Sequence, residues 1–252
     1  MSDYSAYIIC GTPRSSSTLL CEMLTATGVS GCPNSYFRTQ NIDEWAEDWG
    51  VPPAASANDA AFDANYLAAM IREGTKGTGV FGLRLMWGSV ADAEAQLSRL
   101  HGVHPIPELF ERAFGKTLYI HLSREDKLAQ AISLVRAEQS GLWHLKADGT
   151  VFESVASPQP NHYDGARIAA VVDELERDDA AWTEFFASHQ IEPLQLTYNI
   201  VTADPQAALV AVLSALGRDP AAAKDVPVAT RKMGDGVSRD WADQFRAEYR
   251  QG

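Results

Sequence analysis

The sequence is short of cysteine and of basic charge, and each shortage excludes a class of protein. Its three cysteines, Cys10, Cys21 and Cys32, are odd in number and lack CxxC spacing, so neither a disulfide framework nor a zinc site is expected. Lys and Arg number 21 against 33 Asp and Glu, which gives a net charge of −12. Such a charge opposes general binding to nucleic acid or to acidic membranes. Any anion site must therefore be local.

Membrane and export signals are also missing from the sequence. The longest apolar run, AALVAVLSAL from Ala207, is about half of the roughly 20 residues that a membrane span needs. The N-terminus has no basic segment ahead of a long apolar stretch, so it does not resemble a signal peptide. We therefore expect a soluble, cytoplasmic protein. With 252 residues, 46% of them hydrophobic, a single domain over 1–252 can bury a sizeable core.

Short segments rich in β-branched residues alternate with helical patterns along the chain. Strands are expected over 6–10, 79–87, 117–122 and 192–198. Helices are expected near 16–27, 62–73, 89–100, 125–139, 165–187, 204–216 and 238–250. This alternation is typical of an α/β fold with a parallel β-sheet flanked by helices. Two stretches, 52–64 and 150–165, predict loops that are either surface connections or substrate gates.

A loop rich in hydroxyl groups follows the first expected strand and leads into the first expected helix. It has the sequence GTPRSSST, beginning at Gly11. Such a loop directs several backbone N–H groups, and the positive end of the helix dipole, at one point. Arg14 adds a guanidinium that can bind two oxygens at once. Hydroxyl donors are added by Ser15, Ser16, Ser17 and Thr18. The segment predicts a phosphate or sulfate site; the alternative is a serine-rich N-cap beside a surface arginine.

This loop differs from two familiar phosphate-binding loops. Against the Walker pattern GxxxxGK[ST], it keeps the first glycine and the final threonine but has Ser16 and Ser17 where Gly and Lys belong. Because the lysine that reaches the β- and γ-phosphates is absent, a nucleoside triphosphatase is disfavoured. A Cys-dependent phosphatase would need an arginine six residues after Cys10, where this chain has Ser16.

A second cationic segment follows the third expected strand. Arg124 comes just after that strand, and Ser133 lies nine residues later in the next expected helix. Ligands of open parallel sheets bind at the carboxyl ends of the strands. Arg124 can therefore reach the same crevice as the Arg14 loop, so that two anion pockets would share one ligand. A solvated arginine at the start of a helix is the alternative.

These segments resemble those of sulfotransferases. GTPRSSSTLL is similar to their 5′-phosphosulfate loop, and HLSREDKLAQAISLVRA is similar to their 3′-phosphate segment. The resemblance is to the bacterial carbohydrate sulfotransferase family typified by trehalose 2-sulfotransferase. It extends to TGVSGCPNSYF, GVFGLRLMW, LTYNIVTADP and DGVSRDWADQFRAEY, and so covers most of the chain in order.

The resemblance implies a P-loop-like sulfotransferase fold and the donor 3′-phosphoadenosine 5′-phosphosulfate (PAPS), which leaves adenosine 3′,5′-bisphosphate as product. The 5′-phosphosulfate would be held by Arg14, Ser15, Ser16, Ser17 and Thr18. The 3′-phosphate would be held by Arg124 and Ser133. Arg231, near the C-terminus, is expected to cover the donor, with a surface role as the alternative. The resemblance also implies an alcohol acceptor such as a carbohydrate, glycolipid or small metabolite, and a homodimer. No metal is expected.

One position departs from the family pattern. The family has a glutamate in a GxPxEFF segment that is thought to deprotonate the acceptor hydroxyl, but here GCPNSYF places Ser35 at that catalytic position. A serine cannot act as a carboxylate base, so another residue must do so, or the acceptor needs less help. Alternative bases are Asp43, Glu44, His121, His144 and Glu22, none of them singled out by spacing. Glu44 is also read as part of a capping box that begins at Asn41.

Three further residues are expected near the acceptor. Arg84 is a charge inside an otherwise apolar strand, so it either pairs structurally with a carboxylate or faces the sulfuryl group or the acceptor. Tyr36 and Trp87 are the aromatic residues expected to contact the acceptor, although aromatic side chains are more often part of a core.

The sequence leaves two other functions open. A catalytically silent nucleotide-binding protein is conceivable because Ser35 stands in the position of the base. A nucleotide kinase with a degenerate P-loop is the other alternative, and the missing lysine argues against it.

Overall fold

A computed structural model describes residues 4–56, 58–145, 151–154, 161–228 and 236–249. For residues 142–145 and 151–154 it describes the backbone alone. Its centre is a four-stranded parallel sheet in the order β2-β1-β3-β6. The strands are β1 (Ala6–Gly11), β2 (Phe81–Met86), β3 (Thr117–Ser123) and β6 (Leu194–Thr197). Strands β4 (Leu142–Leu145) and β5 (Val151–Ser154) form a separate antiparallel pair. The predicted α/β class and all four predicted strands are confirmed.

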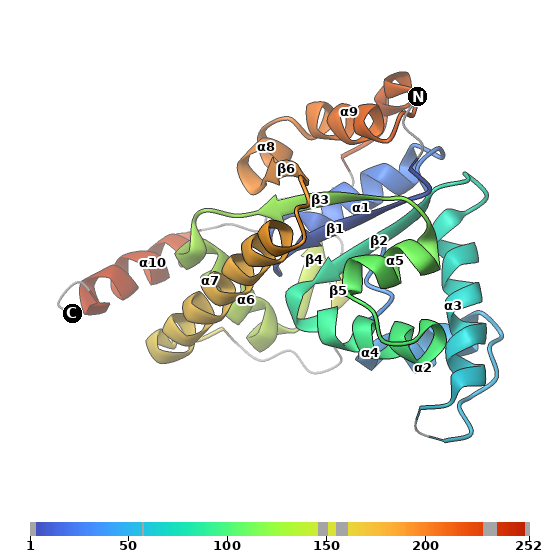
Figure 1. The fold of residues 1–252 in the computed structure, drawn as a ribbon. Helices are drawn as coiled ribbons and strands as arrows, with labels where there is room; N and C mark the ends of the chain where they lie inside the picture. The colour runs from blue at the N-terminus through green and yellow to red at the C-terminus, as the bar shows by residue number, and fades with distance from the viewer. Residues whose placement is uncertain (1–3, 57, 146–150, 155–160, 229–235, 250–252) are drawn as a thin grey trace.

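Helices surround the sheet, as Figure 1 shows. The α-helices are α1 (Ser17–Ala26), α2 (Thr39–Asp48), α3 (Ala60–Thr75), α4 (Val90–His101), α5 (Ile106–Phe114), α6 (Lys127–Ser140), α7 (Gly165–Ser188), α8 (Tyr198–Ala203), α9 (Pro205–Ala215) and α10 (Gly236–Tyr249). Two short 3-10 helices are η1 (Trp87–Ser89) and η2 (Pro220–Ala223). Each of the seven predicted helices corresponds to an observed one within a few residues.

The two faces of the sheet are covered by different cores, because side chains alternate between the faces of a strand. On one face, Ile9 and Leu122 pack with α1 and α9. On the other face, Ile8 and Leu83 pack with α3, α4, α5 and the C-terminal part of α7. In Figure 1, α8 and α9 lie above the sheet, and α4, α5 and α7 lie below it. Strand β1 is buried along its whole length, as expected of a central strand covered on both faces.

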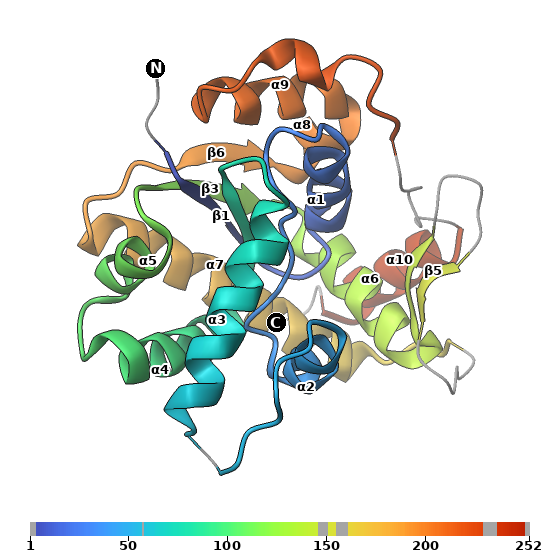
Figure 2. The same ribbon diagram turned by 90° about the vertical axis from the view of Figure 1, so that its right-hand side faces the viewer.

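A third apolar cluster joins helices at the side of the molecule. It packs Ile132 of α6, Val171 of α7 and Trp241 of α10 together. Figure 2 shows α6 and α10 side by side near β5, away from α4 and α5. Helix α6 therefore packs against both α7 and α10.

Several sequence predictions are corrected by the structure. Helices α2, α5 and α8 were not predicted, because each is short or follows a segment rich in turn-forming residues. Asn41 lies inside α2 and donates from Nδ2 to Glu44 Oε2 at 3.1 Å, so the predicted capping box is wrong. The stretch 52–64 already contains the start of α3, where Asp59 caps the N–H groups of Ala61 and Phe62. The stretch 150–165 contains β5.

The register of the sheet places two strand ends side by side. Gly11, the last residue of β1, is opposite Leu122 near the end of β3. Both strands run in the same direction, so the segments that follow them leave the sheet at the same edge. The two predicted anion-binding segments are those two segments.

Candidate active site

The loop from Thr12 to Ser16 is held in an unusual backbone conformation. Arg14 has φ 64° and Ser16 has φ 70°, while Ser15 between them has an ordinary negative φ. Left-handed backbone is costly for residues other than glycine and persists where surrounding structure enforces it. Alternation of this kind turns successive N–H groups toward one concave side, which forms an anion-binding nest. The loop ends at the N-terminus of α1, whose dipole adds positive potential at the same place.

The two predicted anion-binding segments contact each other directly. Arg124 donates from Nη1 to the carbonyl oxygen of Arg14 at 3.0 Å. Arg14 in turn donates from Nε to Ser133 Oγ at 3.0 Å. The Arg124 guanidinium also stacks on the Tyr198 ring, 4.0 Å from its centroid. Four residues from three separate segments of the chain, Arg14, Arg124, Ser133 and Tyr198, therefore form one basic and hydroxyl-rich corner.

Two polar atoms in this corner have no partner among the residues that the structure describes. Ser15 Oγ and Arg124 Nε are both buried without a hydrogen bond there. Buried polar atoms are normally satisfied, so an orphaned hydroxyl and an orphaned guanidinium N–H indicate a ligand with oxygen acceptors. Burial also lowers the pKa of Arg124 from its ordinary value, yet an arginine stays protonated at neutral pH. The corner fits a phosphate or sulfate group.

A buried polar network, missed by sequence reasoning, holds the loop from behind. Gln130 on α6 is fully buried and donates from Nε2 to Thr12 Oγ1 at 2.8 Å and to the Pro13 carbonyl at 2.6 Å. Thr12 donates to Asp179 Oδ1 on α7 at 3.3 Å, and Asp179 also pairs with Lys127. Gln130 could have been found from the sequence, because it lies three residues before Ser133 and so on the same face of the predicted helix. The sequence contains no comparable signal for Asp179, because its partner Thr12 is 167 residues away.

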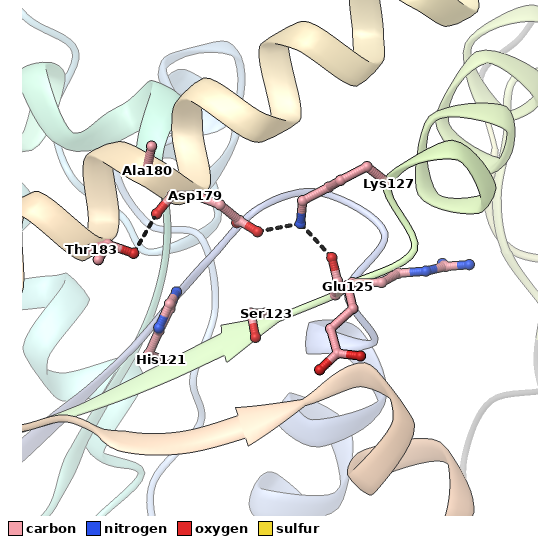
Figure 3. Close-up of a pocket in the computed structure, with 8 residues that line it drawn as sticks. His121, Ser123, Glu125, Lys127, Asp179, Ala180 and Thr183 are labelled. Atoms are coloured by element: carbon pink, nitrogen blue, oxygen red, sulfur yellow. Dashed lines mark hydrogen bonds and ion pairs between the residues drawn. The ribbon is translucent and has the colours of Figure 1, made fainter. Parts of the chain in front are cut away.

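A cavity of about 290 Å³ lies beside this network, between the end of β3 and α7. Figure 3 shows His121 and Ser123 of β3 on one side and Asp179 and Thr183 of α7 on the other, with Lys127 facing Asp179. Lys127 and Asp179 thus belong both to the network and to the lining of this cavity.

Arg84 and Ser35 are brought together at the start of α1. Arg84 donates from Nε to Ser35 Oγ at 2.7 Å and from Nη1 to Thr18 Oγ1 at 2.8 Å. Arg84 lies on β2, and the strand alternation points it toward the α1 face of the sheet. Of the two predicted roles of Arg84, the structural pair with a carboxylate is replaced by hydrogen bonds to two hydroxyls, and contact with the sulfuryl group or the acceptor stays a prediction. The guanidinium therefore links the first turn of α1 to the predicted catalytic position.

Tyr36 and Trp87, the two aromatic residues predicted to contact the acceptor, lie in different environments. Tyr36 is 3% exposed, donates to the Cys32 carbonyl at 2.5 Å and packs against Trp45, Trp49 and Phe81. Tyr36 is therefore a core residue with almost no surface for an acceptor, which corrects the prediction. Trp87 is only partly buried, in η1. Its predicted contact with the acceptor stays a prediction.

The alternative bases are mostly placed away from Arg84. His121 is on the α7 face of β3, pairs with Gln195 at 3.1 Å and packs on Phe186, and burial lowers its pKa. Asp43 and Glu44 are exposed on α2. Glu22 lies on α1, one turn after Thr18. The His144 side chain and Arg231 lie outside the described part of the chain.

Within the described ranges, no group of three His, Cys, Asp or Glu residues is placed to hold a metal ion. No helix in the part of the chain that the structure describes has both the length and the apolar character to cross a membrane.

Comparisons with known proteins agree with this geometry. A family model described as Stf0 sulphotransferase matches residues 6–248. Two curated relatives, each named trehalose 2-sulfotransferase, are 28% identical to this chain. The one from Mycobacterium tuberculosis (strain ATCC 35801 / TMC 107 / Erdman) aligns over 96% of this chain and 94% of its own. The one from Mycolicibacterium smegmatis (strain ATCC 700084 / mc(2)155) aligns over 98% and 97%.

One solved structure is also similar to this chain. It is the sulfotransferase domain from the Synechococcus PCC 7002 olefin synthase, at a TM-score of 0.47 and 16% identity. The match covers 98% of this chain and 89% of that domain.

Proposed function

The chain belongs to the Stf0 sulphotransferase family, and from that premise we propose that it transfers a sulfuryl group from PAPS to a hydroxyl of a carbohydrate. The chain is a sulfotransferase enzyme by this membership, whereas its donor and acceptor are part of the proposal. Because both curated relatives are named for trehalose, we propose trehalose as the first acceptor to test.

The observation that carries the proposal is the contact between the two anion-binding segments. Arg124 bonds the Arg14 carbonyl, and Arg14 bonds Ser133, so both predicted pockets open on one corner. PAPS has phosphate groups at both ends of its ribose and needs two such pockets close together. A single phosphate or sulfate ion would need only one of them.

Each residue of the corner then has a role that its position supports. The Arg14 loop and the N–H groups at the start of α1 would hold the 5′-phosphosulfate, and Arg124 with Ser133 would hold the 3′-phosphate. PAPS supplies an activated sulfuryl group, and adenosine 3′,5′-bisphosphate is left behind. Transfer of this kind, like phosphoryl transfer, depends mainly on positioning and on stabilising charge at equatorial and leaving oxygens. Arg84, bonded to Thr18, is placed to stabilise that charge.

The proposal is tested by incubating the protein with PAPS and a panel of carbohydrates that includes trehalose, with mass spectrometry of the products. The wild type is expected to add one sulfate group. Arg14→Ala is expected to slow transfer by about 100-fold or more, since losing a donor that stabilises developing charge costs about 3 kcal/mol. Arg72→Ala is the matched control, because Arg72 is exposed and pairs with its neighbour Glu73. Donor binding without transfer to any acceptor would favour a catalytically silent protein instead.

We also propose that the protein is a cytoplasmic homodimer that binds neither nucleic acid nor membranes stably. The strongly negative net charge supports the absence of binding to nucleic acid and to membranes. Light scattering of the purified protein tests the dimer, with a mass of twice 27.4 kDa as the expected result.

A further inference from the structure

We propose that the Glu22 carboxylate is the base that removes the proton from the acceptor hydroxyl. This inference rests on the proposed sulfuryl transfer to an alcohol, since any such transfer must release the hydroxyl proton. It assigns to α1 a catalytic role beyond donor binding.

Glu22 lies on the side of α1 that faces the Arg84 contacts. It is four residues after Thr18 in the same helix, and residues spaced in this way share one helix face, about 5–6 Å apart. Thr18 accepts a hydrogen bond from Arg84, and Arg84 also bonds Ser35. The Arg84 guanidinium is within electrostatic range of the Glu22 carboxylate. Glu22 therefore stands next to the point where the donor loop, β2 and the Ser35 segment meet.

The Glu22 carboxylate is available to accept a proton. It is half-buried, and among the residues that the structure describes none forms a hydrogen bond or ion pair with it. Burial raises its pKa above the ordinary value for glutamate, while the Arg84 charge opposes that rise. A base whose pKa lies nearer to neutrality removes a proton more effectively than an ordinary carboxylate.

The groups around Glu22 leave Arg84 as its main charged neighbour. On α1 itself the Cys21 thiol is buried, and burial raises its pKa to about 12, so it is neutral at physiological pH. Tyr7 of β1, packed in the same core as α1, is likewise neutral because burial raises its pKa. Helix α9, which packs against α1, has no titratable side chain.

The other titratable groups near the loop are already engaged or lie elsewhere. Asp179 pairs with Lys127 behind the loop, and His121 is on the opposite face of the sheet from Arg84. Glu44 is exposed on α2 and accepts from Asn41. Ser35 lacks a carboxylate. Among the described residues, Glu22 is thus the carboxylate that combines an unpaired state with proximity to Arg84.

The step balances without any further reactant. The acceptor oxygen forms a bond to sulfur while its proton passes to a Glu22 carboxylate oxygen. The bond between sulfur and the bridging phosphate oxygen breaks, and its electron pair stays on the 5′-phosphate of adenosine 3′,5′-bisphosphate. The Glu22 carboxyl then loses its proton to water.

The first test is the pH dependence of transfer by Glu22→Gln, Glu22→Asp and the control Glu44→Gln. Because the base must be deprotonated, wild-type kcat is expected to rise with pH through the raised pKa of Glu22 and then level off. Glu22→Gln is expected to lose about 100-fold or more in kcat and to lose this acidic limb, as general bases contribute about 10²–10⁴-fold. Glu22→Asp should keep the limb at a lower plateau, and Glu44→Gln should match the wild type.

The outcomes separate the inference from the proposed function. If Glu22→Gln transfers sulfate at the wild-type rate and its kcat still rises with pH as in the wild type, Glu22 is not the base. That result would leave the sulfotransferase proposal standing. Calorimetry with adenosine 3′,5′-bisphosphate shows whether Glu22→Gln is folded, and binding within about twofold of the wild type is expected.

A second measurement decides the inference even if the wild type sulfates no acceptor in the panel. In protein labelled with ¹³C at the glutamate carboxyls, Glu22 is expected to titrate above the ordinary value of about 4.3, and higher still with adenosine 3′,5′-bisphosphate bound, because added negative charge disfavours the carboxylate. An ordinary pKa that the bisphosphate leaves unchanged would overturn the inference.

Discussion

At the scale of single residues, Gly11 sets how closely the end of β1, where the Arg14 loop begins, can approach β3. A Cβ atom at this position would lie 2.7 Å from the Leu122 carbonyl oxygen, which is backbone and cannot rotate away. The Gly11 carbonyl also accepts a hydrogen bond from Trp182 Nε1 at 3.0 Å. The start of the loop is therefore fixed from two sides, by β3 and by α7.

Gly11→Ala is expected to lower the free energy of unfolding by about 1–3 kcal/mol, because the added methyl group must push two paired strands apart. Gly88→Ala is the matched control, since a Cβ there has open space around it. Urea denaturation of both variants measures the difference. Equal stability of the two would contradict the close approach of β1 and β3.

Arg84 connects the first turn of α1 with the Ser35 segment, through two hydrogen bonds from different nitrogens. A lysine has a single ammonium group and cannot reproduce this forked geometry. Arg84→Lys is expected to lower kcat by about 10–100-fold and to leave the affinity for adenosine 3′,5′-bisphosphate nearly unchanged. The control is Arg112→Lys, where an exposed arginine makes two bonds to Glu108. Steady-state kinetics with calorimetry tests this, and a wild-type rate in Arg84→Lys would refute it.

At the scale of elements, the Arg14 loop depends on α6 and α7 as much as on α1. Helix α6 contributes Gln130 and Ser133 to the loop, and α7 contributes Asp179 and Trp182. Helices α6 and α7 also pack along each other. The strained backbone at Arg14 and Ser16 is thus held by two helices that meet behind it.

Asp179→Asn is expected to destabilise the protein by about 2–3 kcal/mol. Asp179 and Lys127 are 18% and 14% exposed at their side chains, and removing one partner leaves the other charge largely buried. The affinity for adenosine 3′,5′-bisphosphate should fall as well, because an asparagine has one acceptor oxygen and cannot accept from both Thr12 and Lys127. Asp173→Asn, at an exposed position of α7, is the control. Chemical denaturation that finds both variants equally stable would contradict this account of α7.

At the scale of the whole molecule, the fold was largely predictable because its signals are local. The apolar strand Ala6–Gly11 and the helical periodicity of α1 can each be recognised within one segment. Helix α2 was not predicted because its aromatic side chains depend on a partner outside the helix: Tyr36 meets Trp45 and Trp49 edge-on, and the two tryptophans stack on each other. The same packing explains why Tyr36 was wrongly predicted to contact an acceptor.

The site was predictable only in part, for the same physical reason. Arg14 and Arg124 follow strands whose ends meet in any parallel sheet, so their proximity could be predicted from topology. The partners of Arg84 could not be predicted in this way. Its hydrogen bond to Ser35 joins two side chains 49 positions apart in the sequence, and strand topology does not indicate such a contact. The roles of these residues toward donor and acceptor stay predictions.

The central claim is that the Arg14 and Arg124 segments form one site for one bisphosphate ligand. Its most direct measurement is calorimetry of adenosine 3′,5′-bisphosphate with the wild type, Arg14→Ala, Arg124→Ala, the double variant and the control Arg72→Ala. Arg14→Ala and Arg124→Ala are each expected to lose about 1.5–3 kcal/mol of binding free energy. The loss in the double variant should differ from the sum of the two single losses, because the two side chains share one hydrogen-bond network. Wild-type protein that does not bind the bisphosphate, or Arg14 and Arg124 variants that bind it as tightly as the control, would contradict the claim.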